Sequence, residues 1–252
     1  MNLPRLLFLF VCLTTTACLT FAQMNLEREA IAANERGAGL VKSGRYQEAV
    51  EAFESSIKLS PTFAVAYNNL GVSYSSLGRL EDAIKVLKRA LELTPGYAEA
   101  YFNLGVALQR LGQPHEAIDA YRRAITLKPD FAQAHNRIGT AFDDDGKHKR
   151  AVQSYIEAIR INPNYAEAYN NLGTSHAEVG HYDQALQNFE RAISLKPDLA
   201  TGYYNIGVVA VRMRQAQIAL KQYRMLTSLD STLALKLYNG IYDGKVIALR
   251  IR

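Results

Sequence analysis

The chain has 252 residues, of which 48% are hydrophobic and 21% are charged, and its formal net charge is +5. This composition suffices to bury a core, so it excludes disorder along the whole chain. The only two cysteines, Cys12 and Cys18, are too few for a disulfide scaffold. After the N-terminal segment, no run approaches the roughly 18 consecutive apolar residues that a membrane-spanning helix needs.

Residues 1–22 are organised like a secretory signal peptide. Arg5 precedes an apolar run over 6–13, and short residues in Thr20-Phe21-Ala22 flank a cleavage point before Gln23. An N-terminal anchor helix is the alternative, but the apolar run is short and interrupted by threonines. The sequence therefore predicts cleavage after Ala22 and export to the periplasm or the extracellular space.

Lipid attachment at Cys18 is a further alternative for this segment. The preceding Thr15-Thr16-Ala17 resembles a bacterial lipoprotein box only weakly. If cleavage follows Ala22, the mature chain has 28 basic and 24 acidic residues, a net charge of +4, and no cysteine. Residues 23–29 are then a short lead-in to the folded part.

A period of 34 residues organises the rest of the chain. Counted from Ala30, it gives six blocks, 30–63, 64–97, 98–131, 132–165, 166–199 and 200–233. The eighth place is glycine in all six blocks: Gly37, Gly71, Gly105, Gly139, Gly173 and Gly207. The fifteenth is glycine in five: Gly44, Gly78, Gly112, Gly146 and Gly180. The twentieth is always alanine, and such a fixed period is typical of repeat proteins.

Each block predicts two helices joined by a turn. In block 64–97, Tyr67, Leu70 and Tyr74 recur at helical spacing. Gly78 then ends the first helix, because glycine readily adopts a left-handed backbone conformation. Pro95 follows the second helix, since proline cannot continue a helical hydrogen-bond ladder. Glycine at the eighth place weakens a helix, so its repetition indicates that the two helices cross too closely for a larger side chain.

The pattern Tyr67-x2-Leu70-Gly71-x2-Tyr74, followed by Ala83, Leu87, Ala90 and Pro95, resembles the tetratricopeptide (TPR) repeat. The resemblance covers 204 of 252 residues and implies an all-α fold, a right-handed solenoid of antiparallel helix pairs. The sixth block departs from the pattern, with Arg214 at the turn glycine and Ser231 at the proline. Terminal repeats are often atypical because they cap the stack.

Residues 234–252 are predicted to form a C-terminal capping helix and tail. The helix is expected over 233–238, with turns at Asn239-Gly240 and Asp243-Gly244. Residues 246–249 are expected to form a short strand or a packed tail.

Side chains that could carry chemistry do not converge in the repeat frame. The five histidines fall at five different places, so we expect no catalytic, metal or cofactor site. The run Asp143-Asp144-Asp145-Gly146 lacks the alternating ligands of a calcium loop and is interpreted as a solvated loop screened by nearby lysines. Cations are interspersed with acids, which argues against a nucleic-acid partner.

The sixth place of the blocks indicates the candidate site. It holds Glu35, Asn69, Asn103, Arg137, Asn171 and Asn205. This column resembles the asparagine ladder of the O-linked N-acetylglucosamine transferase superhelix, without that enzyme's catalytic domain, and the resemblance implies that it faces the concave groove. An amide both donates and accepts hydrogen bonds, so four asparagines suit a peptide backbone, with Arg137, Phe102 and Tyr204 as selectivity elements. The alternative is that these asparagines bind only neighbouring helices.

The leading functional hypothesis is an exported, non-catalytic interaction module that binds an extended segment of a protein or peptide in the concave groove. The alternative is a structural scaffold that self-associates, or packs an envelope complex, through its convex face or C-terminal tail. Its candidate exposed apolar residues are Leu226, Leu229 and the segment 241–251.

Overall fold

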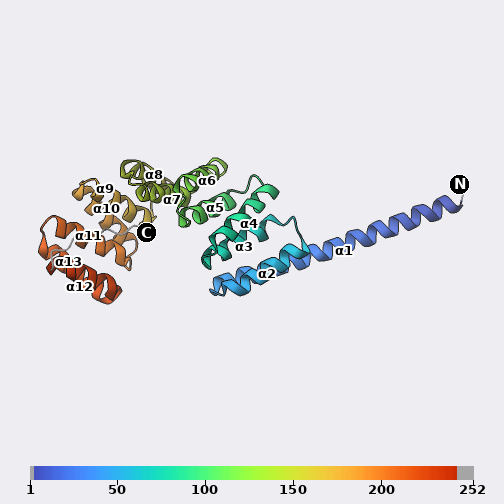
Figure 1. The fold of residues 1–252 in the computed structure, drawn as a ribbon, viewed down its shortest axis with the longest axis horizontal. Coiled ribbons are helices and arrows are strands. Elements are labelled where there is room, and N and C mark those ends of the chain that lie inside the picture. Colours follow the sequence, from blue (N-terminus) through green and yellow to red (C-terminus); the bar gives the residue numbers. More distant parts are fainter. Residues whose placement is uncertain (1–2, 243–252) are drawn as a thin grey trace. The chain divides into compact units, whose positions relative to one another are not determined.

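The computed structural model describes residues 3–242, with side chains from residue 23 onward, and this part contains thirteen helices and no strand (Figure 1). Consecutive helices pack as neighbours from α1 to α5 and from α6 to α13, which confirms the predicted all-α solenoid of helix pairs. The chain divides into an N-terminal unit that ends at Leu111 and a C-terminal unit that starts at Gly112. The two units are described separately.

The N-terminal unit consists of five helices. They are α1 (Leu3–Lys42), α2 (Tyr46–Leu59), α3 (Ala64–Ser76), α4 (Leu80–Leu93) and α5 (Ala98–Arg110). Helix α1 is 40 residues long, and only its C-terminal part packs against α2 (Figure 1). The predicted signal peptide and Cys18 lie in the part of α1 whose side chains are not described, so cleavage and lipid attachment stay predictions. No helix with described side chains is long and apolar enough to cross a membrane.

The C-terminal unit consists of eight helices. They are α6 (Pro114–Leu127), α7 (Ala132–Asp144), α8 (His148–Ile161), α9 (Ala166–Glu178), α10 (Tyr182–Leu195), α11 (Ala200–Arg212), α12 (Ala216–Leu229) and α13 (Ser231–Tyr242). In both units, odd-numbered helices up to α11 are the first helices of the blocks, and even-numbered helices are the second helices. From α3 onward the first helices begin every 34 residues, as the period of the sequence requires.

The turn between first and second helices depends on one left-handed residue. The glycines at the fifteenth place have φ between +68° and +83°, which confirms their predicted role in ending the first helix. At the same place in the sixth block, Arg214 adopts φ +59° and is the one non-glycine residue with positive φ among those described. A side chain with a Cβ is disfavoured in this region, so this turn stores backbone strain.

The glycines at the eighth place mark close crossings within the helix pairs. A Cβ added to Gly37 would lie 2.5 Å from the ring of Phe53, and one added to Gly173 would lie 2.6 Å from the ring of Phe189. Both rings are fully buried on the second helix of the same pair. The predicted steric reason for glycine is therefore confirmed in these helix pairs.

Helix α13 differs from the predicted C-terminal helix in both of its ends. It begins at Ser231, where the Asp230 side chain caps it by accepting a hydrogen bond from the Leu233 backbone N–H at 2.9 Å. Because no proline stands at 231, the helix starts three residues earlier than the first helices of the other blocks. It also continues through Asn239 and buried Gly240 to Tyr242, so the turn predicted at 239–240 is wrong. The predicted turn at 243–244 and segment 246–249 lie outside the described residues.

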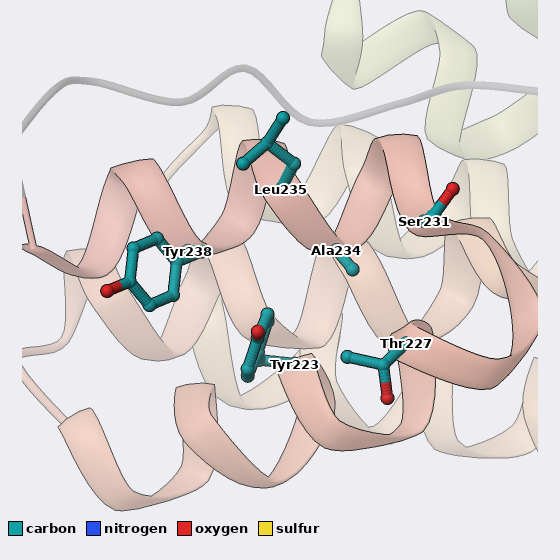
Figure 2. Close-up of a pocket in the computed structure, with 6 residues that line it drawn as sticks. All are labelled: Tyr223, Thr227, Ser231, Ala234, Leu235 and Tyr238. Atoms are coloured by element: carbon teal, nitrogen blue, oxygen red, sulfur yellow. The ribbon is translucent and has the colours of Figure 1, made fainter.

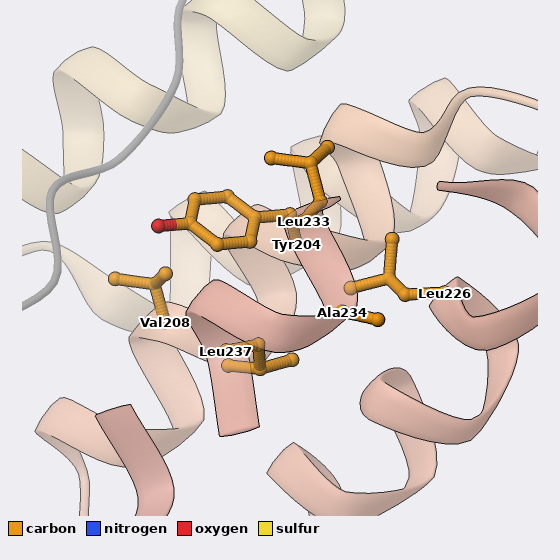
Figure 3. Packing of buried hydrophobic residues seen from close by; sticks show 6 residues of the cluster. All are labelled: Tyr204, Val208, Leu226, Leu233, Ala234 and Leu237. Carbon is orange, nitrogen blue, oxygen red and sulfur yellow. The ribbon is translucent and has the colours of Figure 1, made fainter. Parts of the chain in front are cut away.

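The C-terminal core lies where α11, α12 and α13 meet (Figure 3). Its buried side chains are Tyr204, Val208, Leu226, Leu233, Ala234 and Leu237. Leu226 has no exposed surface, because it packs beneath α13. The expectation that Leu226 is an exposed apolar residue is therefore wrong, whereas Leu229 keeps 37% of its surface exposed.

Candidate functional site: paired amides on the first helices

The asparagines at the sixth place pair with amides on the preceding first helix. In the N-terminal unit, Asn69 Nδ2 donates to Asn34 Oδ1 at 3.0 Å, and Asn103 Nδ2 donates to Asn68 Oδ1 at 2.8 Å. Asn68 in turn donates to Asn69 Oδ1 at 3.3 Å. The result is a chain of amides across α1, α3 and α5, in which Asn69 and Asn103 remain half-buried.

The C-terminal unit repeats this pairing at its own first helices. Asn171 Nδ2 donates to Asn136 Oδ1 at 3.1 Å, and Asn205 Nδ2 donates to Asn170 Oδ1 at 3.1 Å. Asn205 Nδ2 also lies 3.4 Å from Thr174 Oγ1. Asn171 and Asn205 have no exposed surface. All four ladder asparagines therefore connect adjacent helices, which is the scaffold role that the sequence left open.

One buried acceptor of the ladder is left without a partner by this pairing. An amide has two N–H donors and two acceptor lone pairs, and each pair uses one donor of the second amide and one acceptor site of the first. Asn171 Oδ1 is buried and has no hydrogen-bond partner among the described residues. Asn171 Oδ1 is therefore an acceptor that the pairing between first helices does not use.

Arg137 interrupts the row of amides in the C-terminal unit. It is exposed. Burial raises the pKa of Tyr121 and of Tyr165, and the positive charge of Arg137 opposes part of that rise. Phe102, the predicted apolar element of the N-terminal unit, is half-buried on α5. These two predicted residues therefore keep accessible surface.

Tyr204 is buried, whereas its predicted role in partner selectivity requires an accessible side chain. Its side chain is 2% exposed and packs in the C-terminal core against Val208 and Leu233 (Figure 3). Burial in that core corrects the expectation that Tyr204 acts as a selectivity element on an accessible face.

The amides at the fifth place, which supply the acceptors, were not predicted from the sequence. They are Asn34, Asn68, Asn136 and Asn170. A signal was present in the sequence, because a fifth-place asparagine stands 35 residues before each ladder asparagine. The fifth place of block 98–131 is Phe102, and the residue 35 positions later, at the sixth place of the next block, is Arg137. The donor asparagine is therefore absent where its acceptor asparagine is absent.

Asp143 forms a buried polar network rather than part of a solvated loop. Its side chain has no exposed surface and accepts hydrogen bonds from Tyr155 Oη at 2.8 Å and from Ser175 Oγ at 2.7 Å. His148 Nδ1 lies 2.8 Å from the other carboxylate oxygen. The loop interpretation is therefore wrong for Asp143, although Asp145 pairs with Lys147 at 2.5 Å as screening requires.

Burial determines the acidity of this network. Loss of hydration raises the pKa of Asp143, and the hydrogen bonds from His148, Ser175 and Tyr155 oppose that rise. Burial beside this carboxylate likewise raises the pKa of Tyr155 far above its usual range. The network joins α7, α8 and α9, so it couples two consecutive blocks.

The remaining candidate features in the described part of the chain are two histidines and a cavity. The rings of His176 and His181 are tilted by 37° with their centroids 5.9 Å apart, and burial lowers the pKa of His176. Among residues 23–242, no three or more metal-ligating side chains come together.

A cavity of about 320 Å³ between α12 and α13 is lined by Tyr223, Thr227, Ser231, Ala234, Leu235 and Tyr238 (Figure 2). This lining contains no charged side chain.

Helix pairs with a glycine crossing, a left-handed turn and amides linking successive pairs define a helical-repeat solenoid. The chain belongs to the tetratricopeptide repeat family. Family models described as tetratricopeptide repeat match residues 28–96, 62–130 and 166–199, and a model described as TPR repeat matches 142–180. The crystal structure of MamA is 31% identical, with a TM-score of 0.58, and the match covers 65% of this chain and 96% of MamA.

Two further solved structures share the fold. PilF of Pseudomonas aeruginosa is 18% identical with a TM-score of 0.75, and the match covers 88% of this chain and 100% of PilF. YrrB, described as a TPR protein with an unusual peptide-binding site, is 23% identical with a TM-score of 0.55, covering 71% of this chain and 93% of YrrB. A comparison with curated proteins found no match.

Proposed function

We propose that this TPR protein is an exported, non-catalytic interaction module whose first helices bind an extended segment of a partner protein. The observation that carries the proposal is the row of paired amides along these helices, in which Asn69 and Asn103 keep part of their surface exposed. Half-buried Asn69 and Asn103 suit the backbone of a peptide in the N-terminal unit. Exposed Arg137 suits a carboxylate in the C-terminal unit.

The binding energy of such a site follows from the chemistry of its groups. Each net amide hydrogen bond contributes roughly 0.5–1.5 kcal/mol, so a few bonds to a peptide backbone give modest affinity that depends little on sequence. Phe102 adds apolar contact, and Arg137 adds a charge-assisted bond to an acidic group. Peptide binding by YrrB, a TPR protein of the same fold, supports this type of function.

Selection from a random peptide library on the full chain provides probes for a direct test. The selected peptides should be enriched in acidic residues, and Arg137→Ala should weaken their binding about tenfold, as the loss of roughly 1.4 kcal/mol requires. Arg123→Ala is the matched control, because Arg123 is an exposed arginine on second helix α6 of the same unit. Equal effects of the two substitutions would contradict the proposed site.

The export part of the proposal has its own measurement. Expression in a bacterial host with an export pathway should yield a mature protein that begins at Gln23. An intact mass that retains residues 1–22, or that includes lipid on Cys18, would contradict cleavage after Ala22.

A further inference from the structure

A second surface of the C-terminal unit has the chemistry of a docking groove. A cavity of about 350 Å³ lies between second helices α10 and α12, with first helix α11 between them in the chain. Tyr203 and Ile206 of α11 line it together with Ile193 of α10. Ile218 and Met225 of α12 also line it, and they remain 39% and 43% exposed. We call this surface the outer groove.

The other blocks of the same chain show that these two apolar residues are exceptional. Ile218 occupies the nineteenth place, which is polar or charged in the other five blocks: Glu48, Asp82, Glu116, Arg150 and Gln184. Met225 occupies the twenty-sixth place, which is also polar or charged elsewhere: Ser55, Arg89, Arg123, Glu157 and Arg191. The packing of a helix pair therefore does not require an apolar residue at either place. Two exposed apolar side chains at these places indicate a contact outside the repeat.

The charge beside the outer groove indicates the chemistry of what binds there. Helix α12 has no acidic residue, whereas each of the other second helices has at least one. Lys221, which lines the groove, and Arg224 are both exposed on α12. Glu190 on α10 is the one acidic residue in the described lining. The α12 side of the groove is therefore basic, and it would repel a second α12.

The spacing of the apolar residues indicates the shape of the partner. Ile218 and Met225 are seven residues apart, roughly 10.5 Å along the helix axis. An amphipathic helix presents apolar side chains with the same i, i+3 or i+4, i+7 spacing, and such helices bind in grooves between other helices. We propose that the outer groove binds an amphipathic helix of a partner protein, with acidic residues flanking its apolar stripe. The protein then has two binding surfaces, the row of amides on its first helices and the outer groove formed by α10, α11 and α12.

Two synthetic peptides test the proposal with the full chain. One is an 18-residue helix of about five leucines at helical spacing with glutamate at the other positions, and the second has lysine in place of glutamate. Fluorescence anisotropy should show that the glutamate peptide binds at least about tenfold more tightly than the lysine peptide. Its binding should weaken as salt rises, because the charges involved are exposed.

The block sequence provides a variant that preserves the fold. Ile218→Gln combined with Met225→Arg installs the residues of the preceding block, Gln184 and Arg191, and should weaken binding of the glutamate peptide about tenfold. Ile156→Gln is the matched control, since Ile156 is 42% exposed on α8, and it should leave binding unchanged. Arg137→Ala should also have no effect, which separates this surface from the amide ladder.

Three results would overturn the proposal. They are equal binding of the two peptides, no detectable binding of either, or binding that survives the Ile218→Gln and Met225→Arg substitutions. Light scattering of the chain without peptide tests whether a second copy of the chain binds in the outer groove instead. A concentration-dependent dimer that the double substitution abolishes would show that a second copy of the chain occupies the outer groove.

Discussion

Leu237 of α13 fills the space directly above Gly207 of α11. A Cβ at position 207 would lie 2.4 Å from Leu237 Cδ2. In the other described crossings the equivalent glycine faces the second helix of its own pair, as Gly37 faces Phe53 and Gly139 faces Tyr155. The last helix pair is therefore closed by a side chain from the capping helix.

Gly207→Ala should lower the free energy of unfolding by about 1–3 kcal/mol, the usual cost of overpacking a core. Gly39→Ala is the control, because Gly39 is exposed in α1 and nothing lies within 4 Å of an added Cβ. That control should raise stability by about 0.5–1 kcal/mol through helix propensity alone. Urea titration measures both changes, and destabilisation by both substitutions would argue against the packing explanation.

Arg214→Gly should stabilise the protein by about 1 kcal/mol, because glycine adopts φ +59° without the penalty of a Cβ. The converse change, Gly180→Ala at φ +83°, should destabilise it by a similar amount. Thermal unfolding of the two variants and the parent protein checks the prediction. A loss of stability in Arg214→Gly would show that the arginine side chain makes contacts that outweigh its backbone strain.

Asp143→Asn should change how stability depends on pH. Because burial raises the pKa of Asp143 in the folded protein, the folded state binds its proton more readily than the unfolded state does. The contribution of this group is therefore fully present below the unfolded pKa, near pH 4, and is lost as pH rises through the folded pKa. The variant lacks this decline with rising pH.

Urea titrations of the parent and of Asp143→Asn across that pH range give the difference directly. Exposed Asp183 on α10 provides the control variant Asp183→Asn, which should follow the parent protein. If the free energy of unfolding depended on pH in the same way for Asp143→Asn and the parent, the result would contradict a raised pKa of Asp143 in the folded protein.

The amide pair of Asn136 and Asn171 should show coupling in a double-mutant cycle. Each single change to alanine leaves a buried amide without its partner and should cost about 1–3 kcal/mol. The double variant should cost less than the sum by about 0.5–1.5 kcal/mol, because the shared hydrogen bond at 3.1 Å is lost only once. In a control cycle, Asn171→Ala and Asn69→Ala should lower the free energy of unfolding additively. If the costs of Asn136→Ala and Asn171→Ala were also additive, the result would contradict a hydrogen bond between Asn136 and Asn171.

The 34-residue period made most of the helices predictable, because turn glycines, crossing glycines and prolines recur with local physical causes. The sixth place of the blocks alone did not predict which residues the ladder asparagines bind. An amide's partner depends on how adjacent first helices are rotated about their axes relative to one another. Asp143 was misjudged because its polar neighbours in sequence suggested solvent, whereas Tyr155 and Ser175 reach it from two other helices. The extent of α13 was missed because Asp230 caps the helix where the other blocks have a residue before proline.

Amide pairing across 35 residues also determines which blocks can be copied in tandem. A block with asparagine at both its fifth and sixth places supplies an acceptor to the next copy and a donor to the previous one. Blocks 64–97 and 166–199 satisfy this condition, with Asn68-Asn69 and Asn170-Asn171. Blocks 98–131 and 132–165 do not, because Phe102 lacks the acceptor and Arg137 replaces the donor amide. A longer array with unbroken pairing can therefore be built from the second or fifth block alone, which makes these two the natural units of duplication.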